Sequence, residues 1–292
     1  MIKPYIVLYC QVGRGATIDK MIKIASWNIE GRLSDTGDVG RGTPAHILNS
    51  IAKLDADVLL LAEAHSADSL DDLPAGKQLR DLGYQIHSVN YDDDTAERTD
   101  SYNKKLSLVF ASRLPINKFQ VIRLGDLRNA LVAIVGGIRF IGIHLDDRRE
   151  ETRVRQMHDL VKTINKSDMP TIVMGDFNAM HGGDLWPARF LRLRPVRFLA
   201  RFAFVHIAKR AVEMARGEAI SYLENNTNLT DADSQHRPTT TPKVRGFGWL
   251  PSVRLIQIDH IFISPDVKIS DFTISPDLGA DHRAITLEIT NN

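Results

Sequence analysis

The chain has very little cysteine: Cys10 is the single one among 292 residues. One cysteine excludes an internal disulfide framework, and we expect no disulfide-linked partner. A sequence that does not depend on disulfides also fits a reducing compartment, so we expect a cytoplasmic protein.

An excess of charge of one sign is also missing. The 37 basic residues are balanced by 36 acidic ones, which gives a formal net charge of +1. Proteins that bind nucleic acid through their overall charge carry a large basic excess, so any contact with a polyanion must be local in this chain.

Long apolar runs are absent as well. No run reaches the roughly 18–20 residues that span a membrane. The apolar stretch Ile6–Cys10 is short for the core of a signal peptide, and no small-residue cleavage site follows it. We expect residues 1–20 to be a poorly ordered extension, with an extra edge strand at residues 5–9 as the alternative. Residues 21–292 then form one domain.

Several catalytic signatures are absent from the sequence. It has no cysteine cluster and no His-x-x-x-His spacing, which the common zinc sites require. It has no Gly-x-x-x-x-Gly-Lys phosphate loop and no Gly-x-Ser-x-Gly nucleophile elbow. Any catalytic site in this chain must therefore be built from carboxylates, amides and imidazoles that lie outside these signatures.

Short runs rich in β-branched residues recur along the chain and predict strands. They cover residues 22–27, 57–61, 84–89, 106–111, 119–124, 130–135, 138–143, 171–174, 257–263, 267–274 and 284–289. Thr43-Pro44 predicts the start of one long helix and residues 150–164 predict a second. We expect a short helix within residues 65–80 and a polar loop at 91–105. This order predicts an α/β fold with two packed sheets, containing strands of both orientations, covered by helices.

One segment, residues 185–217, breaks this pattern. It contains seven basic residues before its first acidic one, and Leu191, Phe198 and Phe202 fall on one helical face. We predict a basic helical insertion between two strands. Three interpretations stay open: it docks a nucleic-acid backbone, it lies on an anionic membrane surface, or it is a solvated face whose arginine stems cover apolar surface.

Polar side chains follow the apolar runs at the points where strands end. Asn28 and Glu63 come after the first two predicted strands. An amide oxygen and a carboxylate at neighbouring strand ends fit a sparse Mg²⁺ site, because Mg²⁺ keeps several waters and takes one or two protein carboxylates. The alternatives are a turn residue for Asn28 and a solvated surface acid for Glu63.

The later strand ends carry further acids and imidazoles. Asp176 could orient or deprotonate a water, and Asn178 could donate to a phosphate oxygen. Asp281-His282 places an imidazole beside a carboxylate. The alternatives are a common turn for the first pair and a capping acid beside a surface histidine for the second.

Two more histidines follow the same rule. His144 ends a predicted strand and could stabilise a transition state, although a lone histidine there is more often structural. Asp259-His260 opens a strand and could supply a second acid–imidazole interaction.

With these motifs in this order, the sequence resembles the endonuclease/exonuclease/phosphatase superfamily, which has the DNase I-like fold. The resemblance runs from about Met21 to Ile289. Softer features also match: Ala111–Ile116, Arg153–Gln156, Leu229–Ala232 and Thr240–Pro242. The set is specific for the superfamily and weak for the substrate.

The resemblance implies a four-layered α/β/β/α sandwich and a requirement for Mg²⁺ or Mn²⁺. It also implies roles: metal ligands at Asn28 and Glu63, a water-positioning or water-activating Asp176, a phosphate contact at Asn178, a catalytic His282, an Asp281 that orients it or touches the metal, and Asp259 as the acid of the Ile-Asp-His element.

The sequence departs from the family pattern at two strand ends. Ala62 stands where the family usually has a glutamine before its metal-binding glutamate. His144 stands where AP endonucleases usually carry a tyrosine, which favours the DNase I-like, sphingomyelinase-like and tyrosyl-phosphodiesterase-like branches.

The leading expectation is therefore a divalent-metal-dependent phosphoesterase that hydrolyses a phosphodiester bond by metal-assisted attack of water. A nuclease-like substrate comes first, and a lipid or small-molecule phosphate ester comes second. The alternatives of another class are a catalytically inactive family member that binds a partner, and a metal-binding scaffold without turnover.

Overall fold

The computed structural model of the protein describes residues 21–33, 43–65, 69–90, 106–125, 128–182, 212–240, 254 and 256–290. The predictions for residues 1–20, for the loop at 91–105 and for all but the last six residues of the 185–217 insertion lie outside these ranges. None of the helices in the described part of the chain is long and apolar enough to cross a membrane.

Two six-stranded sheets form the centre of the fold. The first contains, in spatial order, β11 (Lys268–Ile274), β12 (Ile285–Thr290), β1 (Met21–Asn28), β2 (Val58–Ala62), β4 (Ser107–Ser112) and β3 (Gln85–Asn90). The second contains β5 (Ile116–Leu124), β6 (Arg128–Val135), β7 (Ile138–His144), β8 (Thr171–Asp176), β10 (Asp259–Ile263) and β9 (Thr230–Asp231). The β1–β2 and β7–β8 pairs are parallel and the other pairs are antiparallel, so both sheets are mixed, as predicted.

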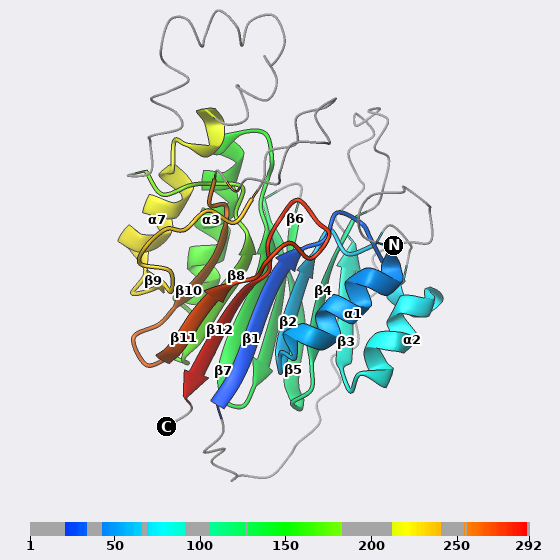
Figure 1. The fold of residues 1–292 in the computed structure, drawn as a ribbon. Coiled ribbons are helices and arrows are strands. Elements are labelled where there is room, and N and C mark those ends of the chain that lie inside the picture. The colour runs from blue at the N-terminus through cyan, green and yellow to red at the C-terminus, as the bar shows by residue number, and fades with distance from the viewer. Residues whose placement is uncertain are drawn as a thin grey trace, which may run out of the picture.

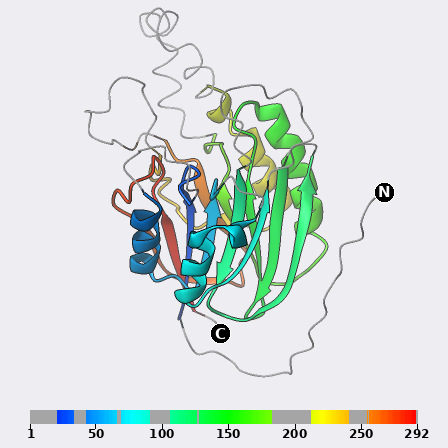
Figure 2. The ribbon, with the colours of Figure 1, turned by 90° about the vertical axis from the view of Figure 1, so that its right-hand side faces the viewer.

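Helices cover the outer face of each sheet (Figures 1 and 2). On the first sheet lie α1 (Pro44–Leu54), α2 (Pro74–Asp81) and the 3₁₀ turn η1 (Leu70–Asp72). On the second lie α3 (Glu150–Ile164) and α7 (Glu218–Asn226). The predicted four-layered α/β/β/α sandwich is confirmed.

Local sequence explains where the first helix begins. Thr43 caps α1, because its hydroxyl accepts a hydrogen bond from the backbone N–H of His46, and Pro44 occupies the first helical position. Ile47, Leu48 and Ile51 of this helix are buried against the first sheet, as the spacing predicts.

The inner faces of the two sheets share one apolar core. The sheets approach closely where β7 faces β2, because Gly142 has no side chain. A Cβ at Gly142 would lie 2.3 Å from Cδ1 of Leu60. Glycine at position 142 of β7 therefore permits the close approach of the two sheets.

The sequence did not predict α7 or β9. Gly217, the residue before α7, has a left-handed backbone (φ 67°) and offers no side-chain cap. The helix therefore lacks the capping signal that identified α1. The strand predicted at 257–263 is shorter in the structure, since β10 begins at Asp259.

Candidate active site

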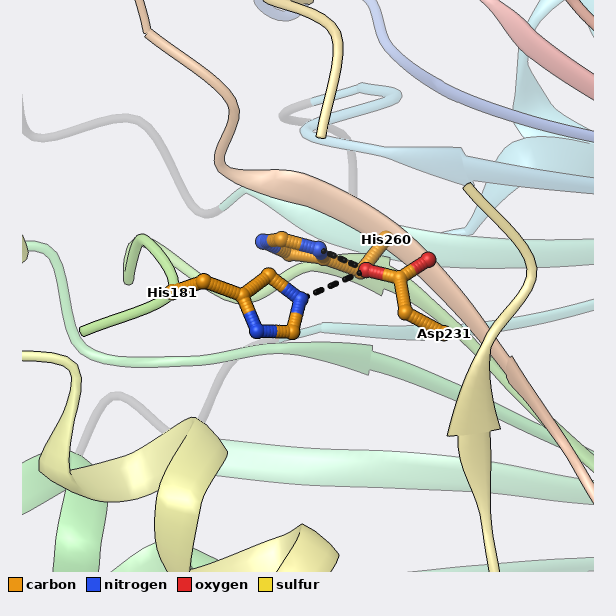
Figure 3. Close-up of side chains that lie close together, drawn as sticks. All are labelled: His181, Asp231 and His260. Carbon is orange, nitrogen blue, oxygen red and sulfur yellow. Dashed lines mark hydrogen bonds and ion pairs between the residues drawn. The ribbon is translucent and has the colours of Figure 1, made fainter. Parts of the chain in front are cut away.

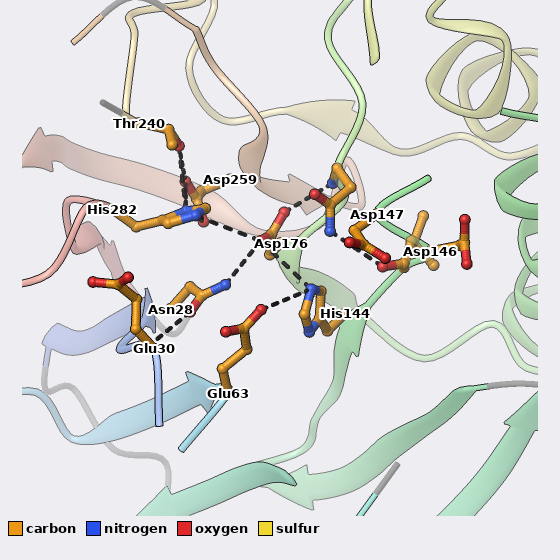
Figure 4. Close-up of polar contacts among 12 residues, drawn as sticks. Asn28, Glu30, Glu63, His144, Asp146, Asp147, Asp176, Thr240, Asp259 and His282 are labelled. Atoms are coloured by element: carbon orange, nitrogen blue, oxygen red, sulfur yellow. Dashed lines mark hydrogen bonds and ion pairs between the residues drawn. The ribbon is translucent and has the colours of Figure 1, made fainter. Parts of the chain in front are cut away.

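The polar residues that follow the strands lie at one edge of the sandwich (Figure 4). Asn28 ends β1 and pairs with Ala62, the residue before Glu63. In the second sheet, His144 pairs with Asp176 at the ends of β7 and β8. Parallel neighbouring strands end at the same edge, and an antiparallel strand begins there, so the topology gathers these side chains in one place.

Asp259 and His282 reach the same edge from the opposite chain direction. Asp259 opens β10 and pairs with Asp176 of the antiparallel β8. His282 comes shortly before β12, which is antiparallel to β1. The sequence thus predicted the shared location of these residues.

Unusual backbone conformations occur at this edge. Glu30, Glu63 and Asn178 have left-handed conformations, with φ values of 53°, 49° and 48°. Gly175, next to Asp176, has φ 147°, and a Cβ there would lie 1.9 Å from the carbonyl oxygen of Ile143. Non-glycine residues in this region are uncommon and cluster at functional sites, because the surrounding structure must hold them there.

His282 and Asp259 form a buried acid–imidazole pair. Nδ1 of His282 lies 3.0 and 2.9 Å from the two carboxylate oxygens of Asp259. Burial acts to lower the pKa of His282, but the charges of Asp259 and Asp176 outweigh it and the pKa lies well above its usual range. Burial likewise acts to raise the pKa of Asp259, and its contacts with His282 bring the net shift below the usual range. Both shifts favour an imidazolium paired with a carboxylate.

Two threonines hold the carboxylate of this pair. The hydroxyls of Thr239 and Thr240 donate to Oδ2 of Asp259 over 2.7 and 3.0 Å. Thr240 belongs to a segment that resembles the family, but the sequence alone indicated no role for it. Thr239 was not predicted as a site residue. A threonine pair some twenty residues before an acid is too weak a signal to predict this contact.

Residues of β1 and the turn after it hold the backbone around His282. The indole N–H of Trp27 donates to the carbonyl oxygen of His282 over 3.0 Å, and the backbone N–H of Asp281 donates to Oε2 of Glu30 over 3.1 Å. The sequence assigned no role to Trp27 or Glu30. Both contacts join segments about 250 residues apart, which only the fold brings together.

Asp176 lies at the centre of the cluster. Its Oδ2 accepts a hydrogen bond from the amide nitrogen of Asn28 (3.0 Å) and lies 3.6 Å from Nε2 of His144 and 3.8 Å from Nε2 of His282. Burial is the main cause that raises its pKa to about 6, while the charge of His282 acts in the opposite direction.

Glu63 faces the same group from the first sheet. Its Oε1 lies 3.7 Å from Nε2 of His144 (Figure 4). Burial, followed by the charge of Asp176, raises the pKa of Glu63 to about 7. At neutral pH this carboxyl is poised between its two protonation states.

Asn178 and Asp281 lie at the margins of the cluster. The backbone N–H of Asn178 donates to Oδ1 of Asp176 over 2.8 Å, and its side-chain amide donates to the carbonyl of Leu145. The carboxylate of Asp281 lies 3.9 Å from Nε2 of His282 and its side chain is 22% exposed. All eight site residues that the sequence predicted therefore lie at this edge.

The chemistry of the donors fits a hard divalent cation. After burial, the charges of Asp176 and Asp281 are further causes that raise the pKa of Glu63. A cation would offset this repulsion, and Mg²⁺ and Mn²⁺ prefer oxygen ligands. Asn28 fits less directly, because its amide nitrogen faces Asp176 and its oxygen accepts from the backbone N–H of Glu30. Its oxygen would face a cation between the carboxylates only with the amide turned over.

A second cluster lies on the other side of β10 (Figure 3). Oδ2 of Asp231 is 2.9 Å from Nε2 of His181 and 2.7 Å from Nδ1 of His260. Nε2 of His260 lies 3.0 Å from the carbonyl oxygen of Ala179, which can only accept a hydrogen bond. His260 therefore donates from both ring nitrogens and is an imidazolium, in agreement with the direction of its raised pKa.

This second cluster corrects one prediction from the sequence. Asp259 and His260 are neighbours in the chain, yet they do not act on the same site. Asp259 contacts His282, whereas His260 contacts Asp231 and holds the segment after Asn178 through Ala179. Successive side chains of a strand point to opposite faces, so adjacent residues cannot share one side of β10.

Comparison with solved structures shows the same fold in several enzymes. A 3′ phosphatase, NExo, from Neisseria bound to a product DNA hairpin is 18% identical, with 92% of this chain and 99% of that chain covered and a TM-score of 0.64. An AP endonuclease from Archaeoglobus fulgidus is 15% identical, with 91% of this chain and 98% of that chain covered and a TM-score of 0.63. ANGEL2, a 2′,3′-cyclic phosphatase in complex with adenosine-2′,3′-vanadate, is 17% identical, with 96% of this chain and 99% of that chain covered and a TM-score of 0.58.

No curated protein matches the sequence. Residues 25–282 match the model of the Endonuclease/Exonuclease/phosphatase family. This match spans most of the 292 residues and includes all eight predicted site residues, from Asn28 to His282. The protein therefore belongs to the endonuclease/exonuclease/phosphatase family.

Proposed function

We propose that the protein is a divalent-metal-dependent phosphoesterase that hydrolyses a phosphodiester bond, with nucleic acid as the favoured substrate. The observation that carries the proposal is the position of Asp176. Its Oδ2 lies 3.8 Å from Nε2 of His282, which Asp259 orients. The same oxygen is 3.6 Å from Nε2 of His144, and Oε1 of Glu63, the proposed metal ligand, is 3.7 Å from that nitrogen.

The metal would be held by Glu63, Asp281 and, with its amide turned over, the side-chain oxygen of Asn28. A bound Mg²⁺ or Mn²⁺ neutralises the negative charge that develops on the phosphate oxygens and the leaving group.

Asp176 is the residue that we expect to position the attacking water and take its proton. Its pKa of about 6 makes it mostly ionised at neutral pH but still basic enough to accept a proton. As water bonds to phosphorus, the ester P–O bond breaks and the leaving oxygen takes a proton. His282 can supply this proton from Nε2, because Nδ1 is held by Asp259.

His144 and Asn178 complete the proposed site. Nε2 of His144 lies between Glu63 and Asp176, at 3.7 and 3.6 Å, where it can stabilise charge on a phosphate oxygen. Asn178 holds Asp176 through its backbone N–H, and we expect its amide to contact the phosphate.

The preference for nucleic acid rests on the enzymes that share this fold. The solved structures of similar fold include a phosphatase bound to a DNA hairpin and an AP endonuclease. The nearly balanced charge of this chain argues against tight non-specific binding of DNA, so the contacts with nucleic acid would be local.

A hydrolysis screen of the purified protein tests the proposal. Plasmid DNA, single-stranded RNA, phospholipid vesicles and bis-p-nitrophenyl phosphate would each be incubated with Mg²⁺, Mn²⁺ or EDTA, with His282→Ala as the control. We expect cleavage of DNA or RNA, and we expect this cleavage to require both metal and His282. Cleavage of phospholipid alone would indicate the lipid alternative, and no turnover of any substrate would indicate an inactive family member.

A further inference from the structure

Gln257 carries a buried side-chain amide that makes no hydrogen bond in the part of the chain that the structure describes. The residue is 3% exposed, and neither its Oε1 nor its Nε2 has a hydrogen-bond partner within the described ranges. Buried side-chain amides are nearly always hydrogen-bonded, because an unpaired one has lost its contacts with water without replacement. An apolar side chain of similar shape would avoid this cost. The amide therefore needs an explanation.

The position of Gln257 places it at the active-site edge. The backbone N–H of Phe177 donates to the carbonyl of Ile258 over 2.8 Å, which continues the pairing of Asp176 with Asp259 by one residue. Gln257 is the next residue along. It therefore lies beside the turn that carries Asp176 and Asn178.

The alternation of side chains sends Gln257 to the side of the acid–imidazole pair. Ile258 packs with Met180, Met214 and Ala215, and Ile256 packs against the same cluster. Residues two apart share a face of an extended chain, so Gln257 leaves the opposite face, together with Asp259. The carboxylate of Asp259 on this face contacts His282.

Burial of Gln257 does not distinguish it from the proposed catalytic residues. Asp176 and His144 are each 2% exposed and His282 is 7% exposed.

Gln156 shows how a structural amide behaves in this protein. It is 1% exposed, and its Oε1 accepts a hydrogen bond from the backbone N–H of Asp146 over 2.9 Å, while its Nε2 has no partner within the described residues. Gln156 therefore satisfies a backbone group of the fold. Gln257 satisfies none in the described part of the chain.

We propose that Gln257 is a substrate-binding residue that donates its amide N–H to a non-bridging oxygen of the phosphate ester. The inference rests on the proposed phosphoesterase function. A neutral amide suits this position, because it can bind a phosphate oxygen without changing the charge balance between Asp259 and His282. A lysine or arginine there would add a positive charge that disfavours the imidazolium of His282.

The test compares Gln257→Leu with the wild-type protein in two measurements: the kinetics of bis-p-nitrophenyl phosphate hydrolysis with Mg²⁺, and the Tm. We expect KM to rise about tenfold, since a hydrogen bond to a charged group is lost. We expect Tm to stay the same or to rise, since an unpaired buried amide has been removed. Gln257→Glu should raise KM further, because a carboxylate repels the phosphate.

Gln156→Leu is the matched control for stability. It should lower Tm, because it leaves the N–H of Asp146 without its acceptor. The proposal is overturned if Gln257→Leu keeps KM within about twofold of the wild type, or if it lowers Tm as Gln156→Leu does without changing KM. The KM of Gln257→Leu tests the proposed role of Gln257 even if Gln257→Glu does not fold. A wild-type protein that hydrolyses no substrate would instead remove the proposed function, and this inference with it.

Discussion

Nδ1 of His282 lies within hydrogen-bond distance of both carboxylate oxygens of Asp259, at 3.0 and 2.9 Å. This contact fixes the ring so that Nε2 faces Asp176, 3.8 Å away. The same contact raises the pKa of His282 against the effect of burial. One acid therefore sets both the orientation and the charge of the imidazole.

Asp259→Asn should lower kcat by about 10²–10⁴-fold and change KM little, because the imidazole loses its proton and its fixed orientation. The pKa of His282, followed by NMR, should fall. Asp271→Asn on the exposed strand β11 is the control and should behave as the wild type. A kcat within about threefold of wild type for Asp259→Asn would contradict this role.

Glu30 is expected to position the segment that carries His282. Its carboxylate accepts from the backbone N–H of Asp281, and an amide oxygen could accept the same bond. Glu30→Ala should lower kcat about tenfold, an expected loss of roughly one hydrogen bond, whereas Glu30→Gln should retain most activity. Steady-state kinetics of the two variants distinguish this role from an effect of charge, for which Gln and Ala would be equally impaired.

Divalent metal should stabilise the protein more at neutral than at acidic pH. Burial and the charge of Asp176 raise the pKa of Glu63 to about 7, so this ligand is mostly protonated at pH 5.5 and more available at pH 7.5. We expect the rise in Tm caused by Mg²⁺, relative to EDTA, to be larger at pH 7.5, and to be reduced in Glu63→Gln. Equal Tm rises in the wild type and in Glu63→Gln would exclude Glu63 as a ligand.

The ion pair between Asp231 and His260 should stabilise the fold within a defined pH window. The pKa of Asp231 is lowered, so its contribution is present above the unfolded value near 3.9 and is lost as pH falls through the folded pKa. The pKa of His260 is raised, so its contribution is complete below about 6.5 and is lost as pH rises through the folded pKa.

Asp231→Asn should therefore lower the free energy of unfolding by about 3–5 kcal/mol at pH 6, because it leaves a buried imidazolium without its counter-ion. Urea denaturation between pH 4 and 9 would measure this. The difference between variant and wild type should shrink at high pH, where His260 is neutral in both. A difference that is independent of pH would argue against the ion pair.

The sequence predicted the gathering of the site because that follows from topology. Asn28, Glu63, His144 and Asp176 each follow a strand, and parallel strands end at a common edge. The exact limits of α3 were also predicted, since Glu150–Ile164 is an amphipathic stretch whose buried side includes Met157.

Which groups contact each other was not predictable from local patterns. His260 follows Asp259 in the chain, but strand alternation separates them and tertiary packing chooses Asp231 and His282 as their partners. Thr239 and Trp27 contact the acid–imidazole pair only because loops from distant segments meet there. Only the three-dimensional structure shows that the amide of Gln257 has no hydrogen-bond partner among the described residues.

Asp176 is the carboxylate that we propose activates water between His282 and the metal site, and the proposed mechanism depends on it most. The most direct measurement is the rate of bis-p-nitrophenyl phosphate hydrolysis by wild type and Asp176→Asn, with Mg²⁺ and with EDTA, after circular dichroism has shown that both are folded. We predict metal-dependent turnover in the wild type and a kcat lower by at least about 10²-fold in Asp176→Asn. Metal-dependent turnover at the wild-type rate in Asp176→Asn would contradict it.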